Sequence, residues 1–174
     1  MSKAVLISIR PKWVEKITNG EKTIEVRKTR PKLDTPFKCY IYCTNSGVAT
    51  GMWGKHGKVV GEFTCNTVTN LFSNSRFWLN EDDVLQTCLS AAEIRKYADG
   101  ANGLYGWHIS NLKIYDAPKK LGEFWRDCPE YSELSTNCWS CENVCGDGNE
   151  TDCNTDGRLY LHRPPQSWCY VEEG

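Results

Sequence analysis

The chain has 174 residues, 40% of them hydrophobic and 25% charged, with a net charge of −1 at pH 7. This length predicts a single domain, residues 1–174, with a substantial core. No apolar run is long enough to cross a membrane, and the N-terminus has no signal-peptide pattern. We therefore expect a cytoplasmic protein without a membrane partner, and a monomer is the default expectation.

The small net charge conceals an uneven distribution. Residues 1–38 carry ten Lys or Arg against four Asp or Glu, whereas residues 123–174 carry three against eleven. The basic first segment predicts an anionic ligand such as a nucleic acid, and the acidic last segment argues against binding over the whole surface. An ordinary solvated distribution of charge is the alternative.

The first part of the chain predicts the order strand, helix, strand. Residues 4–9 form a short apolar, β-branched run that is typical of a buried strand. Pro11 suits the first turn of a helix, and Gly20 suits its end. A further strand is expected at residues 39–43, with alternate side chains sharing a face.

Charged residues are concentrated in the strand that follows Gly20. Alternation predicts a polar face of Thr23, Glu25 and Arg27 and an apolar face of Ile24 and Val26. Lys22 lies at the entrance of the strand, beside the polar face. This pattern places a cation, a carboxylate and a guanidinium close together, although an ordinary solvated sheet face has the same pattern.

The middle of the chain predicts further strands and two short helices. Residues 59–68 and 104–109 favour strands, the second continuing towards residue 115. Residues 81–87 indicate a helical turn. Ser90 and Glu93 form a capping-box pattern, which predicts a helix through residue 97.

The segment after residue 118 is acidic, poor in aliphatic residues and rich in cysteine. Four of its cysteines have the spacing of a thiolate metal site: Cys138, Cys141, Cys145 and Cys153. Four sulfur ligands predict a structural zinc ion, with Cys128 as a reserve ligand. The same spacing also suits free thiols, an iron–sulfur cluster or, less well in a chain without an export signal, disulfides.

The C-terminal part carries three residues suited to a planar base. Arg163 precedes two prolines and is expected to be extended, and Gln166 and Trp168 follow it in a closing strand. A tryptophan ring can stack on a base while an amide reads its edge. The alternative for Trp168 is a place in the core.

Together these motifs resemble the ASCH domain family. The resemblance rests on Pro11-Lys12, on Gly20-x-Lys22-x-x-Glu25-x-Arg27 and on Gly106-Trp107-His108-Ile109. It spans roughly residues 3–120 and 163–172. It implies an α+β, PUA-like fold with a mostly antiparallel pseudo-barrel sheet and a few helices, into which the zinc-bound segment 126–157 is inserted. It also implies a cleft beside the first helix.

The expected function is binding of RNA or a modified nucleoside in that cleft. Phosphate or base-edge contacts are predicted for Lys12, Lys22, Arg27 and Arg163, an edge contact for Gln166, and stacking for Trp107 or Trp168. The protein is then a binding module, and the question of whether it is also an enzyme stays open.

Two catalytic alternatives use the same cleft. Some similar proteins hydrolyse N4-acetylcytidine with a lysine, a threonine and a glutamate. Lys22 stands in the matching place, but Glu25 replaces the threonine and only Glu93 offers a position for the second glutamate. Glu25 would then act as general base. The other alternative is a ribonuclease, in which Lys22 and Arg27 stabilise the phosphorane and Glu25 or a histidine moves protons.

Overall fold

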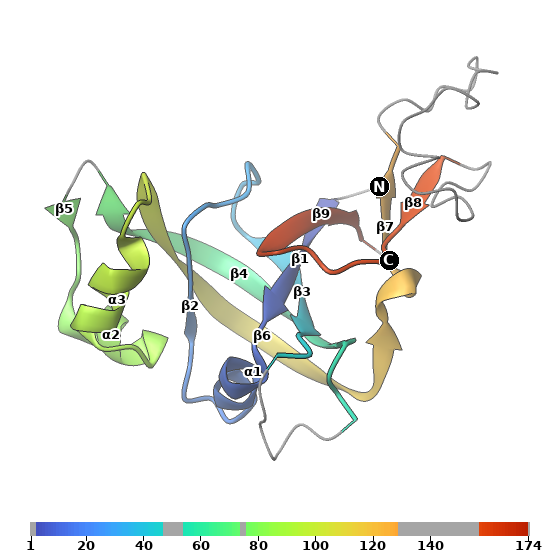
Figure 1. The fold of residues 1–174 in the computed structure, drawn as a ribbon, viewed down its shortest axis with the longest axis horizontal. Helices are drawn as coiled ribbons and strands as arrows, with labels where there is room; N and C mark the ends of the chain where they lie inside the picture. The colour runs from blue at the N-terminus through green and yellow to red at the C-terminus, as the bar shows by residue number, and fades with distance from the viewer. Residues whose placement is uncertain (1–2, 47–53, 74–75, 129–156, 174) are drawn as a thin grey trace.

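The computed structural model describes residues 3–46, 54–73, 76–128 and 157–173 (Figure 1). The strands are β1 (Lys3–Ile9), β2 (Ile24–Arg27), β3 (Phe37–Cys43), β4 (Lys58–Ser73), β5 (Arg76–Phe77), β6 (Gly103–Lys120), β7 (Trp125–Asp127), β8 (Arg158–Tyr160) and β9 (Trp168–Glu172). The α-helices in this part of the chain are α1 (Pro11–Thr18), α2 (Glu81–Thr87) and α3 (Ala91–Ala98).

One large, twisted sheet organises the molecule. Its strand order is β2-β6-β4-β3-β1-β9, with β5 paired to β4, and β7 and β8 form a separate ribbon. β1 and β3 are parallel, and the other pairs are antiparallel. The long strands β4 and β6 cross the whole molecule, with α1 at one end and the α2–α3 pair at the other (Figure 1). The predicted α+β fold with a mostly antiparallel sheet is confirmed.

Both faces of the central strands are buried. Cys39, Ile41 and Cys43 of β3 pack on the face that α1 covers. Tyr40 and Tyr42 of the same strand pack on the opposite face, against Phe124 and its neighbours. The predicted alternation along this strand is therefore confirmed, and both of its faces exclude water.

The helix ends follow the sequence signals. Pro11 is the first residue of α1, and Gly20 follows its end with φ +75°, a conformation that favours glycine. The Ser90 side chain accepts from the Glu93 backbone N–H at the start of α3, and the Glu93 carboxylate accepts from the Ser90 N–H in return. The strands are longer than predicted, since β4 continues to Ser73.

Strand β2 differs most from the sequence expectation. All four of its residues are buried, including Glu25 at 5% and Arg27 at 9% exposure. β2 pairs along β6, and the Thr23 backbone N–H bonds to Gln86 O in α2. The polar face is therefore covered by other segments, and the alternative of an ordinary solvated face is wrong.

The four cysteines of the predicted zinc site lie outside the described residues. Cys128, the reserve ligand, is buried, and its backbone N–H donates to Gly157 O. Among the residues that the structure describes, no group of three or more His, Cys, Asp or Glu side chains could hold a metal ion. No described helix is long and apolar enough to cross a membrane.

Candidate functional site

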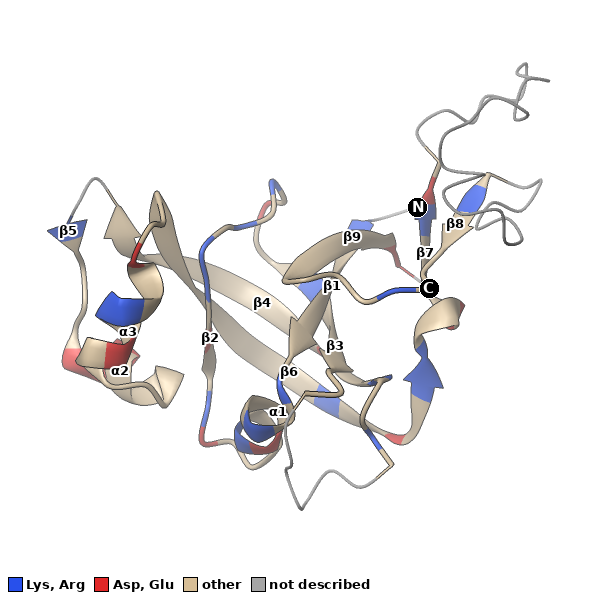
Figure 2. Ribbon diagram, in the orientation of Figure 1, with Lys and Arg blue, Asp and Glu red and all other residues tan. Residues whose placement is uncertain are grey.

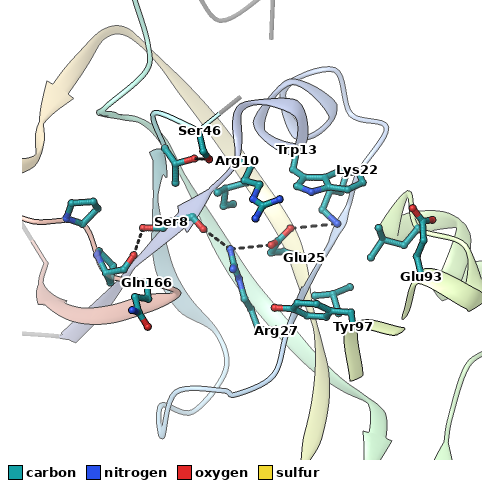
Figure 3. A pocket seen from close by; sticks show the side chains of 16 residues that line it. Ser8, Arg10, Trp13, Lys22, Glu25, Arg27, Ser46, Glu93, Tyr97 and Gln166 are labelled. Carbon is teal, nitrogen blue, oxygen red and sulfur yellow. Dashed lines mark hydrogen bonds and ion pairs between the residues drawn. The ribbon is translucent and has the colours of Figure 1, made fainter. Parts of the chain in front are cut away.

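A cleft of about 660 Å³ opens between α1, β2, α3 and the segment before β9 (Figure 3). Its described lining residues are Ser8, Ile9, Arg10, Trp13, Lys22, Glu25, Val26, Arg27, Thr44, Ser46, Leu89, Glu93, Tyr97, Pro164, Pro165 and Gln166. The structure thus brings together Lys22, Glu25, Arg27 and Gln166, which come from two distant parts of the chain. This cleft lies beside the first helix, where the family resemblance places one.

Lys22 is the most enclosed charged residue of the cleft, with 3% exposure. Its ammonium group donates to the backbone oxygens of Ile24, at 2.8 Å, and Thr87, at 2.7 Å. A third acceptor, Glu25 Oε2, lies 3.3 Å away. Three acceptors match the three N–H donors of an ammonium group, so Lys22 is held as a fixed cation that ties β2 to the end of α2.

Glu25 lies between two cations. Arg27 Nη2 contacts Glu25 Oε1 at 3.0 Å and donates to Ser8 O at 2.7 Å. Figure 3 shows the resulting row, in which the carboxylate is flanked by Arg27 on one side and Lys22 on the other. Buried charges are tolerated when they are paired and hydrogen-bonded, as these are.

Two atoms of this row have no hydrogen-bond partner within the described part of the chain. They are Glu25 Oε2 and Arg27 Nε, and both are enclosed. Glu25 Oε2 still has the Lys22 ammonium at 3.3 Å. Unpartnered buried polar atoms are costly for folding, and such atoms are common where a site is arranged for a ligand.

Ser8 connects the charge row to the segment before β9. Its backbone oxygen accepts from Arg27, its N–H donates to Ser167 O at 2.9 Å, and its hydroxyl donates to Pro165 O at 2.7 Å. The prolines and Gln166 are therefore fixed against the end of β1. The Gln166 side chain is placed beside the charge row by this contact (Figure 3).

The walls of the cleft carry aromatic rings and a second guanidinium. The Trp13 ring lies 5.2 Å from the Lys22 ammonium, and Tyr97 of α3 is 40% exposed. Arg10 is exposed at the start of α1 and points into the cleft in Figure 3. The sequence analysis missed Ser8, Arg10 and Tyr97. Arg10 had one usable signal, since it directly precedes the Pro11-Lys12 motif.

Glu93 lines the cleft, as its position in the sequence suggested for a second glutamate. Its carboxylate accepts from the Ser90 N–H and hydroxyl, both at 2.8 Å. These hydrogen bonds, backbone first, lower the pKa of Glu93 below its ordinary value. Glu93 is therefore held as a helix-capping carboxylate, which makes it a weaker base than an unbonded carboxylate.

Trp107 requires a correction. The sequence analysis offered it as a stacking surface, but its ring is 0% exposed and packs against Phe37 and Trp168 in the core. Cross-strand pairing of β6 with both β2 and β4 encloses it. The ring cannot meet a ligand in this conformation.

The other predicted binding residues lie outside the described lining of the cleft. Trp168 is half-buried beside Trp107 and donates its Nε1–H to Thr29 Oγ1 at 2.9 Å, which agrees with the core alternative. Lys12 is exposed on α1, with its ammonium 4.3 Å from the Trp13 ring. Arg163 is exposed next to Pro164, which does line the cleft.

None of the three histidines lines the cleft. His108 lies on β6, where its ring Nε2 and Thr69 Oγ1 are 3.3 Å apart, and His56 lies in the turn before β4. His162 is exposed ahead of β9. The ribonuclease alternative would therefore depend on carboxylates alone for proton transfer at the described cleft.

Comparison with known proteins identifies the class to which this fold and cleft belong. The chain belongs to the ASCH domain family, whose model matches residues 7–146. No curated protein matches the chain.

Solved structures from Zymomonas mobilis share the fold. The crystal structure of ASCH from this organism has 16% identity and a TM-score of 0.58, covering 98% of this chain and 88% of that one. A tyrosine-to-phenylalanine mutant of the Zymomonas mobilis protein has 16% identity and a TM-score of 0.57, covering 99% and 92%. A serine-to-alanine mutant of the same protein has 14% identity and a TM-score of 0.56, covering 98% and 89%.

Proposed function

We propose that the cleft binds a nucleoside unit of RNA, either an ordinary or a modified one. The observation that carries the proposal is the row of Lys22, Glu25 and Arg27, which is buried at the base of a cleft with aromatic walls. A fixed row of donors and acceptors suits the edge of a base, and aromatic rings suit its faces. The cleft volume of about 660 Å³ is in the range of small-ligand sites.

Each wall has a separate role in this proposal. Tyr97 supplies an exposed ring for stacking, and Gln166 supplies an amide that can donate to and accept from a base edge. Arg10 is placed at the mouth of the cleft, where a guanidinium can hold a phosphate. Lys22 acts indirectly, since its acceptors are protein groups and its charge holds Glu25 in position.

Binding of cytidine, N4-acetylcytidine and a short single-stranded RNA, measured by calorimetry, tests the proposal. Tyr97→Ala should weaken binding about tenfold or more, because stacking on one base is worth ~1–3 kcal/mol. Tyr97→Phe is the matched control, since it keeps the ring and should bind almost normally. Absence of binding for all three ligands, or equal affinities of both variants, would refute the proposal.

A second candidate function is hydrolysis of an N4-acylated cytidine. The observation that favours it is the enclosed Glu25 carboxylate, whose Oε2 has no hydrogen-bond partner among the described residues and lies near a fixed cation. Such a carboxylate can accept a proton from water as the water attacks the amide carbon, giving cytidine and acetate. Lys22 would stabilise the charge of the carboxylate in this role.

Chromatography of N4-acetylcytidine incubated with the protein tests this second function. Cytidine release that is lost in Glu25→Gln, but retained in Glu93→Gln, would support Glu25 as the base. No release from the folded wild-type protein, in the presence of measurable binding, would leave the cleft as a binding site.

A further inference from the structure

We infer that the cleft continues into a track for the phosphates of single-stranded RNA, formed by Lys58 at the start of β4 and Lys120 at the end of β6. The inference rests on the proposed nucleoside site and deepens it, because it makes the ligand a polymer. It assigns a role to two lysines that lie outside the described lining of the cleft.

Strand register connects the two lysines to the cleft. Ile9, which lines the cleft at the end of β1, is the Cα partner of Cys43 in β3. Cys43 is the partner of Lys58, and Lys58 is the partner of Lys120. These residues form one row across four adjacent strands. At ~4.8 Å per strand, the row extends ~14 Å from the cleft, which is enough for a few nucleotides.

The two lysines are on the face of the sheet that α1 covers. Paired Cα partners point their side chains to the same face, so Lys58 and Lys120 share the face of Ile9 and Cys43. Those two residues belong to the core cluster that includes Val14 of α1. The track therefore lies on the same side of the sheet as α1, which forms one wall of the cleft.

Folding does not explain this pair of like charges. Lys58 and Lys120 are directly opposite each other in an antiparallel pair, an arrangement that destabilises a sheet. Within the described part of the chain, neither side chain makes an ion pair. The nearby Glu123 carboxylate accepts from the backbone N–H of Lys120. Two opposed cations that lack anionic partners are complementary to an anion supplied by a ligand.

The wider charge distribution agrees with a track that begins at the cleft. Figure 2 shows Lys and Arg at α1, at the start of β4 and at the end of β6, along one side of the ribbon. Arg10 stands where this side meets the mouth of the cleft. A free nucleoside would not reach the lysines, whereas the phosphates of a bound strand would pass over them.

The dependence of RNA affinity on salt tests the track. Binding of a fluorescein-labelled, single-stranded RNA octamer is measured by anisotropy between about 50 and 200 mM salt, for the wild type and for Lys58→Ala/Lys120→Ala. Each phosphate contact on a single strand contributes about −0.7 to the slope of log K against log salt, so the double variant should lose about 1.4 from that slope. Its affinity for free cytidine should stay unchanged.

The matched control is Lys32→Ala/Lys96→Ala, which removes two exposed lysines from the β2–β3 connection and α3. The control should retain the wild-type salt slope. Equal slopes for the two double variants, with cytidine binding intact, would overturn the track and leave the nucleoside site standing. If the wild type binds neither cytidine nor the octamer, the proposed function fails and the track fails with it.

A stability measurement separates binding from folding. Removing two opposed like charges should leave the melting temperature unchanged or raise it, because the pair is unfavourable in the free protein. A marked fall in melting temperature would show that the lysines stabilise the fold, and that result would also contradict the inference.

Discussion

The protein buries two glutamates in opposite electrostatic environments. Glu25 on β2 lies between two cations, whereas Glu172 on β9, also 5% exposed, has Asp127 of β7 near it. Burial, and then the charge of Asp127, raises the pKa of Glu172 above its ordinary value. The comparison shows that burial alone does not define a site. The cleft differs because its charges are balanced and fixed before any ligand arrives.

Lys22→Ala should have the largest effect on this comparison. The substitution leaves Glu25 buried beside Arg27 alone and leaves Thr87 O without its donor. Breaking a buried pair by removing one partner costs about 3–5 kcal/mol of unfolding free energy. Chemical denaturation measures this loss, and Lys12→Ala on exposed α1 serves as the control. The strand pattern alone would predict an intact fold, so a mutant as stable as the control would contradict the buried environment described above.

Glu25→Gln should have a smaller effect of the same sign. The amide keeps the shape of the side chain but removes the charge that balances Lys22 and Arg27. Hydrogen bonds to charged groups contribute about 1.5–3 kcal/mol, and we expect a loss in that range from urea unfolding curves. An unchanged midpoint would mean that the two cations do not need this carboxylate.

Glu172→Gln should have the opposite sign. A raised pKa in the folded state means that the charged carboxylate opposes folding, so stability falls as the pH rises from the ordinary value of 4.5 through the folded value. The variant should gain roughly 1 kcal/mol at pH 7 and nothing below about pH 4. Thermal melts across this pH range measure the gain. A gain that is independent of pH would indicate a packing effect instead.

The smallest expected effect concerns Glu93 at the rim of the cleft. Ser90→Ala removes the hydroxyl contact that helps to lower the pKa of Glu93, so that pKa should rise towards its ordinary value. Loss of a serine cap also costs about 1 kcal/mol of stability. Carboxyl chemical shifts followed by NMR titration report the pKa directly. A value that does not move would show that the remaining backbone contact is sufficient.

Local signals in the sequence predicted the secondary structure well. Helix α1 begins at Pro11, and helix α3 follows the Ser90–Glu93 capping box, because caps are formed by residues a few positions apart. The alternation in β3 was predicted for the same reason. Strand lengths were underestimated, since β4 and β6 extend each other through pairing that no short window contains.

The site was predicted in part. Lys22, Glu25 and Arg27 are close in sequence, so their proximity followed from the strand pattern. Their burial did not, because it depends on contacts such as Lys22 with Thr87 O, 65 positions away. Trp107 was misassigned for the same reason, since an aromatic residue beside a charged strand gives no sign of which other strands enclose it.

The position of β9 has a consequence for synthesis on the ribosome. β9 pairs with β1, so the last strand of the sheet closes the edge of the first, from Lys3 opposite Glu172 to Ile7 opposite Trp168. Until residues 168–172 emerge, the apolar strand β1 has one unpaired edge, which is a template for aggregation. Chains that stop before Trp168 should therefore accumulate as insoluble protein even though the rest of the sheet is encoded.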